Sequence, residues 1–412
     1  MEWVACVGID WSDRKHDWAL WSHDGSTDGG VFKSKPEEIH EWVRELRKRY
    51  PEGKILVALE QSRGALIYAL SQYDFLLIMP INPRALKAYR ESLRVSGAKD
   101  DPSDAELICS FARLHHQRLR LWSPDDPLTR KLRLLTEMRR NLVDQRTANH
   151  HALTAACKQY FPQVLEWFGG AGKALTLAFL GKWPTLGKAK AARRDTVGSF
   201  IRANGRRSDG KIEELIASIH AAVALTTDEA IVEAQAMAAQ SLASIILAID
   251  AQVKEYDQRI ESLTTQHPDH ELFASFPGAG KIMAPRLAVA FGEDRSRWQE
   301  AREIQSYSGI APVVESSGRG VWVHARWRCP KFLKQTFHEF AQASLPHSRW
   351  ALAYYHQQRD RGAGHHAAIR SLAYRWIRIL FRCWKTNEHY NEARYIDRLQ
   401  QKKSPVISRL VA

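Results

Sequence analysis

The feature that most constrains the fold is a series of short apolar runs in the first 80 residues of the chain. Three of these runs lie close together and are separated by turn-forming residues such as His23-Asp24-Gly25-Ser26, which indicates an antiparallel meander. Apolar residues then recur at helical spacing between Ile39 and Leu46, and two further apolar runs follow. We therefore expect five strands, at residues 4–10, 17–21, 31–33, 55–59 and 75–79.

Three strands, a helix and then strands that alternate with helices is the element order of a ribonuclease H-like domain. We expect this α/β domain to span residues 1–120 of the 412-residue chain. Long amphipathic helices dominate the remainder, so we expect a helical coiled-coil region at residues 121–268 and a mainly helical C-terminal domain at residues 269–412. The predicted fold class is therefore α/β followed by α.

The second long helix of the coiled-coil region is expected to begin with the capping-box pattern Thr226-x-x-Glu229. It has an apolar stripe from Leu242 to Leu263 in alternating steps of four and three residues, which requires a partner helix. An internal helical hairpin and a dimerising coiled coil would bury the same stripe. The sequence leaves both arrangements open.

The chain carries a formal net charge of +14. This excess of cations favours nucleic acid as the partner, because each Lys or Arg that meets a phosphate releases condensed counterions. No uninterrupted apolar run is long enough to span a membrane, and the first residues do not resemble a signal peptide, so we expect a cytoplasmic protein with no membrane partner. The five cysteines are scattered and include no CxxC pair, so any metal is expected to have oxygen ligands.

Two segments are candidates for contact with a phosphate backbone. Residues 181–211 gather Lys and Arg, including Arg193 and Arg194, around Gly and Pro, and we expect a flexible basic stretch there. A solvated loop is the alternative. The Gly-rich turn at residues 276–281 ends in Lys281 and precedes a helix, so its amides and its lysine are candidates for a DNA contact. A simple turn at the start of a helix explains it equally well.

Four acidic residues are placed as a two-metal site for phosphoryl transfer would require, because such a site needs several converging carboxylates. Asp10 ends the first strand and Glu60 follows the strand at 55–59, so the two can lie side by side at one edge of the sheet. Asp101 and Asp104 begin a helix, where helix capping alone would explain both. Asp104, however, falls on the apolar face of that helix, where a charge is expensive unless it is paired or bound to metal.

These residues resemble the DEDD transposases of bacterial insertion sequences and the related Piv-type DNA invertases. The resemblance covers nearly the whole chain. The family is the one numbered one hundred and ten among insertion sequences, and its members consist of a RuvC-like domain, a coiled-coil region and a serine-bearing transposase domain. The matching segments are Val7–Ser12, Leu59-Glu60 and Lys99–Ala105 in the N-terminal part, and Phe276–Gly280, Tyr307–Pro312 and Glu315–Gly318 in the C-terminal part.

The resemblance implies a transposase that cuts and rejoins DNA. It implies that Asp10, Glu60, Asp101 and Asp104 bind Mg²⁺, and that Ser317 attacks a DNA phosphate as in a serine recombinase. It also implies guidance by a non-coding bridge RNA that pairs with donor and target DNA. Homodimers that pair into tetramers on DNA are expected, with carboxylates of one subunit completing the serine site of another.

Two positions of this chain leave a choice between neighbours. Asp100 is a rival of Asp101 for the third ligand, and the spacing to Asp104 favours Asp101. Ser316 is a rival of Ser317 for the nucleophile, and the position before Gly318 favours Ser317.

On its residues alone, Ser317 has the surroundings of a loop residue, because Ser-Ser-Gly is a common turn composition. The cations that follow it are candidates for holding the scissile phosphate; they are Arg319, Arg326, Arg328 and Lys331. Two other functions stay open. One is a RuvC-like, metal-dependent junction nuclease in which water attacks, and the other is a catalytically silent RNA-binding scaffold.

Overall fold

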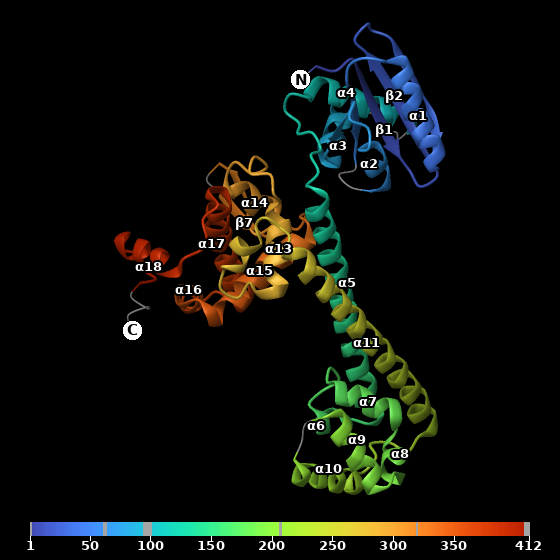
Figure 1. The fold of residues 1–412 in the computed structure, drawn as a ribbon, viewed down its shortest axis with the longest axis vertical. Coiled ribbons are helices and arrows are strands. Elements are labelled where there is room, and N and C mark those ends of the chain that lie inside the picture. The colour runs from blue at the N-terminus through green and yellow to red at the C-terminus, as the bar shows by residue number, and fades with distance from the viewer. Residues whose placement is uncertain (1, 61–63, 94–100, 206–207, 319, 408–412) are drawn as a thin grey trace. The chain divides into compact units, whose positions relative to one another are not determined.

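The computed structural model describes residues 2–60, 64–93, 101–205, 208–318 and 320–407, with the backbone alone at residues 101–103. Two compact units make up the chain, Met1–Pro124 and Asp125–Ala412 (Figure 1). Each unit has its own core and is described separately. The further division at residue 268 stays a prediction.

The first unit contains a five-stranded mixed sheet with strand order β3-β2-β1-β4-β5. The first three strands form the expected antiparallel meander, and β4 and β5 add to it in parallel. All five predicted strands are present, within a few residues of the expected bounds. They are β1 (Ala5–Trp11), β2 (Lys15–Ser22), β3 (Thr27–Lys33), β4 (Ile55–Leu59) and β5 (Leu76–Pro80). This arrangement is consistent with a ribonuclease H-like domain.

Helices cover both faces of this sheet. Alternate residues of β1 and β4 point to opposite faces, so Val7 and Val57 pack with the apolar side of α1 (Pro36–Arg49). Cys6 and Leu56 belong to the opposite core, which α4 (Asp101–His115) covers. The unit also contains α2 (Ala65–Leu70) and α3 (Pro83–Leu93).

Gly8 sets the distance between α4 and β1. A Cβ atom at this position would overlap the carbonyl oxygen of Ala105 and the amide nitrogen of Cys109, both on the backbone of α4. Backbone atoms of a packed helix cannot swing aside as a flexible side chain can. Only glycine therefore allows α4 to lie this close to the central strand.

The second unit is organised around two long antiparallel helices, α5 (Pro127–Tyr160) and α11 (Glu229–Thr264). Arg139 of α5 forms an ion pair with Asp257 of α11, and Arg146 lies 2.9 Å from Asp250. The apolar stripe of α11, including Ile246, is buried against α5 and its neighbours. Within one chain, the partner of the stripe is therefore an internal helix.

The N-terminus of α11 differs from the expected capping box. Asp228 is the N-cap residue, and its carboxylate accepts a hydrogen bond from the amide of Ala230 at 3.0 Å. The Thr226 hydroxyl oxygen accepts instead from the amide of Asp228. The aspartate one residue before Glu229 outcompetes the threonine because a carboxylate is a strong N-cap acceptor.

The basic segment at 181–211 is helical where it is described, so the expectation of a flexible stretch was wrong. Apolar residues such as Leu186, Val197 and Ile201 are buried in a core that they share with α5 and α11. Sequence reasoning weighted the cations and overlooked these apolar residues at helical spacing. The helices between α5 and α11 are α6 (Gln163–Phe168), α7 (Ala174–Lys182), α8 (Leu186–Ala191), α9 (Arg194–Asn204) and α10 (Asp209–Ala221).

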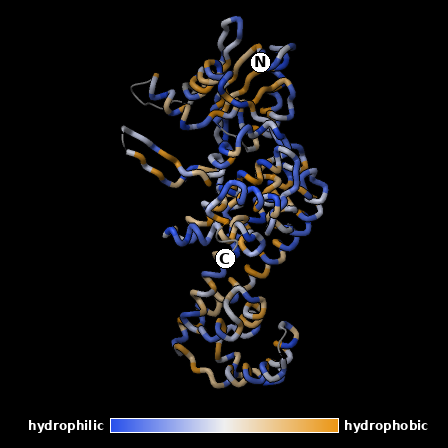
Figure 2. Tube along the Cα trace, turned by 90° about the vertical axis from the view of Figure 1, so that its left-hand side faces the viewer, coloured by the Kyte–Doolittle hydropathy of each residue, from blue (hydrophilic) through white to orange (hydrophobic). Residues whose placement is uncertain are grey.

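The C-terminal part of the second unit is mainly helical, as expected, and has a separate core rich in aromatic residues such as Trp350 and Trp376. Figure 2 shows hydrophilic and hydrophobic residues interspersed along the chain, as expected for helices that bury one side. The elements are α12 (His270–Ala274), α13 (Gly280–Phe291), α14 (Ala301–Tyr307), β6 (Val313–Ser317), β7 (Gly320–His324), α15 (Lys331–Ser344), η1 (Leu345–His347), α16 (Arg349–Asp360), α17 (His365–Thr386) and α18 (Glu392–Gln401).

Among the described helices, α11 alone has the length and apolar composition that a membrane span requires. Its buried side packs on α5 and α7 of the same unit.

We predict that Gly8→Ala loosens α4 from the sheet, because the added methyl group collides with backbone atoms. Overpacking of this kind costs about 1–3 kcal/mol. Amide hydrogen exchange of the full chain should show faster exchange in β1 and α4.

Gly210→Ala is the matched control for this substitution. Gly210 lies in α10, where an added Cβ has open space. Alanine at this position should leave amide exchange in β1 and α4 unchanged, and in α10 it should leave exchange unchanged or slow it. Unchanged exchange in Gly8→Ala would show that α4 does not depend on this contact.

Candidate functional site

Asp10 and Glu60 lie next to each other at the ends of two neighbouring parallel strands. Ile9 of β1 pairs with Leu59 of β4. Asp10 is the next residue along β1, and Glu60 directly follows β4. The parallel register therefore brings these two acids to one edge of the sheet, as the sequence predicted.

The first turn of α4 reaches the same edge. Gly8 packs against the turn of α4 between Ala105 and Cys109. The distance along a strand between residues two apart is about 6.6 Å, and the distance along a helix between residues four apart is about 6 Å. The chain direction of α4 is opposite to that of β1. The distance from Gly8 to Asp10 along β1 therefore nearly equals the distance from Ala105 back to Asp101 along α4. The backbone at Asp101 thus lies beside the end of β1, while its side chain is outside the described residues.

Asp104 is buried, with 3% of its surface exposed. Arg90 of α3 meets this carboxylate, with Nη2 2.5 Å from Oδ1. The sequence argument held that a charge on this face needs a cation, and Arg90 is a cation that sequence reasoning did not name. Sequence alone gave no signal for this pair, because it depends on how α3 packs on α4.

A further acid, Asp17, was missed by the sequence reasoning. It is the cross-strand partner of Asp10 in the β1–β2 register, so the two side chains share a face of the sheet. Asp17 is buried, and Lys15 Nζ lies 3.3 Å from its carboxylate. The signal that could have found it is the tight turn between the first two strands, which sets this register.

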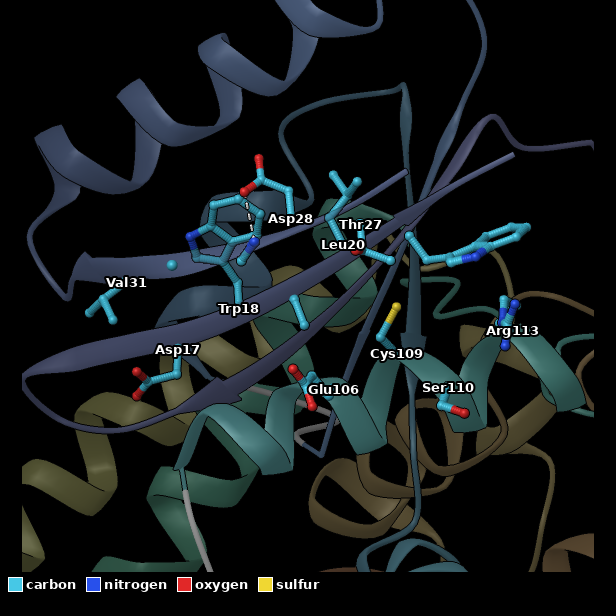
Figure 3. A pocket seen from close by; sticks show the side chains of 14 residues that line it. Asp17, Trp18, Leu20, Thr27, Asp28, Val31, Glu106, Cys109, Ser110 and Arg113 are labelled. Carbon is cyan, nitrogen blue, oxygen red and sulfur yellow. Dashed lines mark hydrogen bonds between the residues drawn. The ribbon is translucent and has the colours of Figure 1, made fainter. Parts of the chain in front are cut away.

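Asp17 also lines a groove of about 410 Å³ on the α4 face of the sheet. Figure 3 shows Glu106, Cys109 and Ser110 of α4 along one side of the groove and β2 above them. Arg113 of α4 is at one end, with its guanidinium 4.6 Å from the Trp21 ring. The acidic edge of the sheet therefore continues into a solvent-accessible groove.

The described side chains include no group of three or more His, Cys, Asp or Glu arranged to hold a metal ion. Two features of the site account for this: Asp104 faces Arg90, and the side chain of Asp101 is not among those described. Asp100 also lies outside the described residues. Oxygen donors from Asp10 and Glu60 nevertheless fit the preference of Mg²⁺.

Ser317 is the last residue of β6, at the tip of a hairpin with β7, and not in an irregular loop. It pairs with Gly320 across the hairpin, and Gly318 adopts a left-handed conformation with φ +58 in the turn. A Cβ atom on Gly320 would lie 3.1 Å from the Trp322 ring, so the indole leans over the partner of Ser317. Ser317 itself is exposed.

The hairpin register separates the two candidate serines. Ser317 shares a face with Glu315, Trp322 and His324, and His324 Nε2 lies 3.6 Å from the carboxylate of Glu315. Ser316 lies on the opposite face, where its neighbours are exposed valines: Val314, Val321 and Val323. The titratable side chains Glu315 and His324 therefore lie on the same face as Ser317, whereas the described neighbours of Ser316 on the other face are valines.

The predicted phosphate-binding cations differ in how far their charge is already neutralised. Lys281 Nζ lies 2.5 Å from Glu261, and Arg194 lies 2.9 Å from Glu213. Arg193 is exposed at the start of α9. Arg319 lies outside the described residues, and the other predicted cations follow the hairpin: Arg326 is half-buried, and Arg328 and Lys331 are exposed.

The Gly-rich turn before α13 has a structural explanation. A Cβ atom on Gly278 would overlap the carbonyl oxygen of Ala343 on α15. The glycine therefore lets this turn pass close to a neighbouring helix. That contact favours the helix-entry alternative over a phosphate site at this turn.

Comparison with known proteins connects both units to one group. Residues 7–162 match a family model described as a transposase, with the name DEDD_Tnp_IS110. Residues 270–356 match the model described as the transposase IS116/IS110/IS902 family. The first match includes the strand-end acids and the second includes the hairpin.

Whole-length relatives agree with these matches. The chain is similar to the mini-circle putative transposase for IS117 of Streptomyces coelicolor, with 28% identity over 94% of this chain and 95% of the relative. It is 27% identical to the insertion element IS116 uncharacterized 44.8 kDa protein of Streptomyces clavuligerus, over 91% and 93% of the two chains. It is 26% identical to the insertion element IS900 uncharacterized 42 kDa protein of Mycobacterium paratuberculosis, over 83% and 85%. Since both family models name IS110 transposases and the relatives align with most of the chain, this chain belongs to the IS116/IS110/IS902 family of transposases and is a DNA transposase.

Proposed function

We propose that this transposase recombines donor and target DNA through a phosphoserine intermediate at Ser317, with Mg²⁺ held by Asp10, Glu60, Asp101 and Asp104. One observation carries the metal part of the proposal. The β1–β4 register and the Gly8 contact bring Asp10, Glu60 and the first turn of α4 to one edge of the sheet. Sheet edges of this kind collect side chains from elements far apart in sequence.

Mg²⁺ bound there would neutralise charge that develops on the phosphate and orient its oxygens. Asp10 and Glu60 supply carboxylate oxygens from rigid strand ends, which hold their positions better than loop residues do. Asp104 becomes available as a ligand when it leaves Arg90. The Arg90 guanidinium therefore competes with a divalent cation for the same carboxylate.

Ser317 performs the covalent step. Its hydroxyl oxygen forms a bond to phosphorus, the bond between phosphorus and one deoxyribose oxygen breaks, and the hydroxyl proton passes to the departing oxygen. A hydroxyl of the second DNA then reverses the step. Each step exchanges one phosphate ester for another, so rejoining needs no high-energy cofactor. Arg326, Arg328 and Lys331 are placed after the hairpin to hold the phosphate.

The remaining parts of the proposal concern partners. A non-coding bridge RNA pairs with donor and target DNA, which relieves the protein of reading bases itself. The positive charge of the chain suits both nucleic acids. Homodimers assemble into tetramers on DNA in the cytoplasm, and the acids of one subunit serve the serine of another.

Serine chemistry is tested by recombination between two plasmids that carry the element's ends and a target, with the flanking non-coding RNA supplied. Ser317→Ala should lower recombination by about three orders of magnitude or more and abolish a covalent protein–DNA adduct. The readouts are recombinant plasmids and adducts that survive denaturation.

Ser316→Ala is the matched control and should keep both activities, because its side chain lies on the valine face. Full activity of Ser317→Ala would leave water as the attacking group and favour the RuvC-like junction nuclease. Recombination without the RNA would overturn RNA guidance alone.

The Arg90 pair is tested by Arg90→Met in the full chain. Removing one partner of a buried ion pair costs about 3–5 kcal/mol. In EDTA, the midpoint temperature of the unfolding transition of the first unit should therefore be lower in the variant than in the wild type. Mg²⁺ should raise that transition more in the variant than in the wild type, because the ion takes the place of the guanidinium.

Arg49→Met is the control, since Arg49 pairs with Asp28 at the surface, where a pair contributes about 0–1 kcal/mol. If Mg²⁺ restores no stability to Arg90→Met, Asp104 is not a metal ligand.

A further inference from the structure

We propose that the groove between α17 and α18 binds the phosphate backbone of a nucleic acid. The groove has a volume of about 490 Å³. It lies in the second unit, among residues for which neither the sequence nor the comparisons indicated a role. The proposal extends the proposed function, because a recombinase must hold long stretches of nucleic acid away from the cleaved bond.

Two rows of cations face this groove. Arg375, Arg378 and Arg382 lie on one side of α17, because steps of three and four residues repeat on the same helical face. Arg394 and Arg398 are four residues apart on α18, and Lys402 follows one turn later at its end. The groove thus collects six cationic side chains from two helices.

Little negative charge offsets these cations. Among the described residues, the single carboxylate that lines the groove is Glu388, whose oxygen lies 3.7 Å from Arg394. The other five cations form no ion pair with a described residue; they are Arg375, Arg378, Arg382, Arg398 and Lys402. Six cations against one carboxylate leave a net charge of +5 in one groove. Such a concentration is favourable only beside a polyanion.

The base of the groove is ordered by packing. Arg375 lies with its guanidinium 4.3 Å from the centre of the Tyr354 ring. Tyr395 of α18 is largely buried against Trp350, with ring centres 4.8 Å apart. Burial raises the pKa of the Tyr395 phenol, and the nearby Arg375 and Arg378 oppose this rise. The phenol therefore stays neutral and leaves the cations without a counter-charge.

Contacts with the core also fix α18 and the segment before it. Leu399 is buried in the C-terminal core. Tyr390, just before the helix, donates its amide to Ser275 Oγ at 3.0 Å and accepts a hydrogen bond from Trp350 Nε1 at 2.8 Å. The two helices that carry the cations are therefore held in place by the core rather than by contacts between the two rows.

The spacing of the cations fits a continuous backbone better than one isolated phosphate. Seven residues separate Arg375 from Arg382, which is about 10 Å along a helix. One strand of a duplex rises about 3.4 Å per phosphate along the duplex axis, so a row parallel to that axis spans about three phosphate steps. Arg378, Arg382, Arg394 and Lys402 are exposed and can reach such a strand.

Two cations that the sequence singled out differ from the groove cations in their charge pairing. Lys281 and Arg194 are each already paired with a glutamate. A phosphate that binds there must displace a carboxylate, whereas in the α17–α18 groove only Arg394 has such a competitor among the described residues. The phosphates could belong to the DNA or to the guide RNA, which share this chemistry.

The test measures how the affinity of the full chain depends on salt, separately for a DNA duplex with the element's end and for the flanking non-coding RNA. The variant combines Arg378→Gln, Arg382→Gln and Arg394→Gln. Loss of three phosphate contacts should lower the slope of log K against log salt concentration by about 2–3 for the nucleic acid that occupies the groove. Loss in one arm alone identifies that nucleic acid.

Two further variants make the test specific. Lys131→Gln, Lys254→Gln and Arg259→Gln together remove the same charge from exposed positions on α5 and α11, and this triple variant should change the slope less. Replacing the three groove arginines with lysine should retain most of the slope, which separates charge from folding.

The groove proposal would be overturned if the groove variant had the wild-type salt slope for both the DNA and the RNA. It would also be overturned if the groove and control variants lowered the salt slope equally. Binding does not require Ser317 chemistry, so the two proposals fail separately. If the wild type forms the Ser317 adduct and the groove variant keeps the wild-type salt slope, the groove proposal alone is refuted. If the wild type forms no adduct and the groove variant has a lower salt slope, the serine mechanism alone is refuted.

Discussion

The contact between Gly8 and the backbone of α4 is the constraint on which the first unit depends. It brings a helix to van der Waals distance from the central strand, with Ala105 and Cys109 above the glycine. The pitch of α4 then determines which of its residues lie beside the end of β1, and these residues belong to the first turn of α4, which contains the acids. A side chain at residue 8 would push α4 outward and move those acids away from Asp10 and Glu60. A residue without any chemistry of its own thus determines whether carboxylates from three elements can converge.

The elements of the first unit were predictable because their apolar patterns are local. Alternation and turn residues located all five strands, and the two apolar runs after the first helix matched β4 and β5 closely. The relation between elements was harder to obtain. Asp17 was missed because its importance depends on the β1–β2 register, and Arg90 was missed because it depends on the packing of α3 on α4. The hairpin at Ser317 was missed because Ser-Ser-Gly is typical of many turns, and the strands beside it are short and exposed.

Charged residues were the least predictable part of the chain. The basic segment at 181–211 contains helices with a core, because apolar residues such as Ile201 outweigh the cations between them. The cations of the α17–α18 groove attracted no attention in the sequence, since they alternate with the aromatic and aliphatic residues of a core helix. What distinguishes the two sets is the presence of acidic neighbours in space. Arg194 has Glu213, whereas Arg378 and Arg382 face other cations.

The β6–β7 hairpin has a consequence for when the enzyme can act. A ribbon of two strands has little stability of its own in water, and the face opposite Ser317 displays Val314, Val321 and Val323 to solvent. Trp327, just beyond the ribbon, has 82% of its surface exposed. A surface that covered those valines would bury apolar area and stabilise the ribbon. Under the proposed serine mechanism, a partner surface on the valine face would therefore also hold the Ser317 hydroxyl in position, and a protomer without that partner would present its serine on an unsupported ribbon.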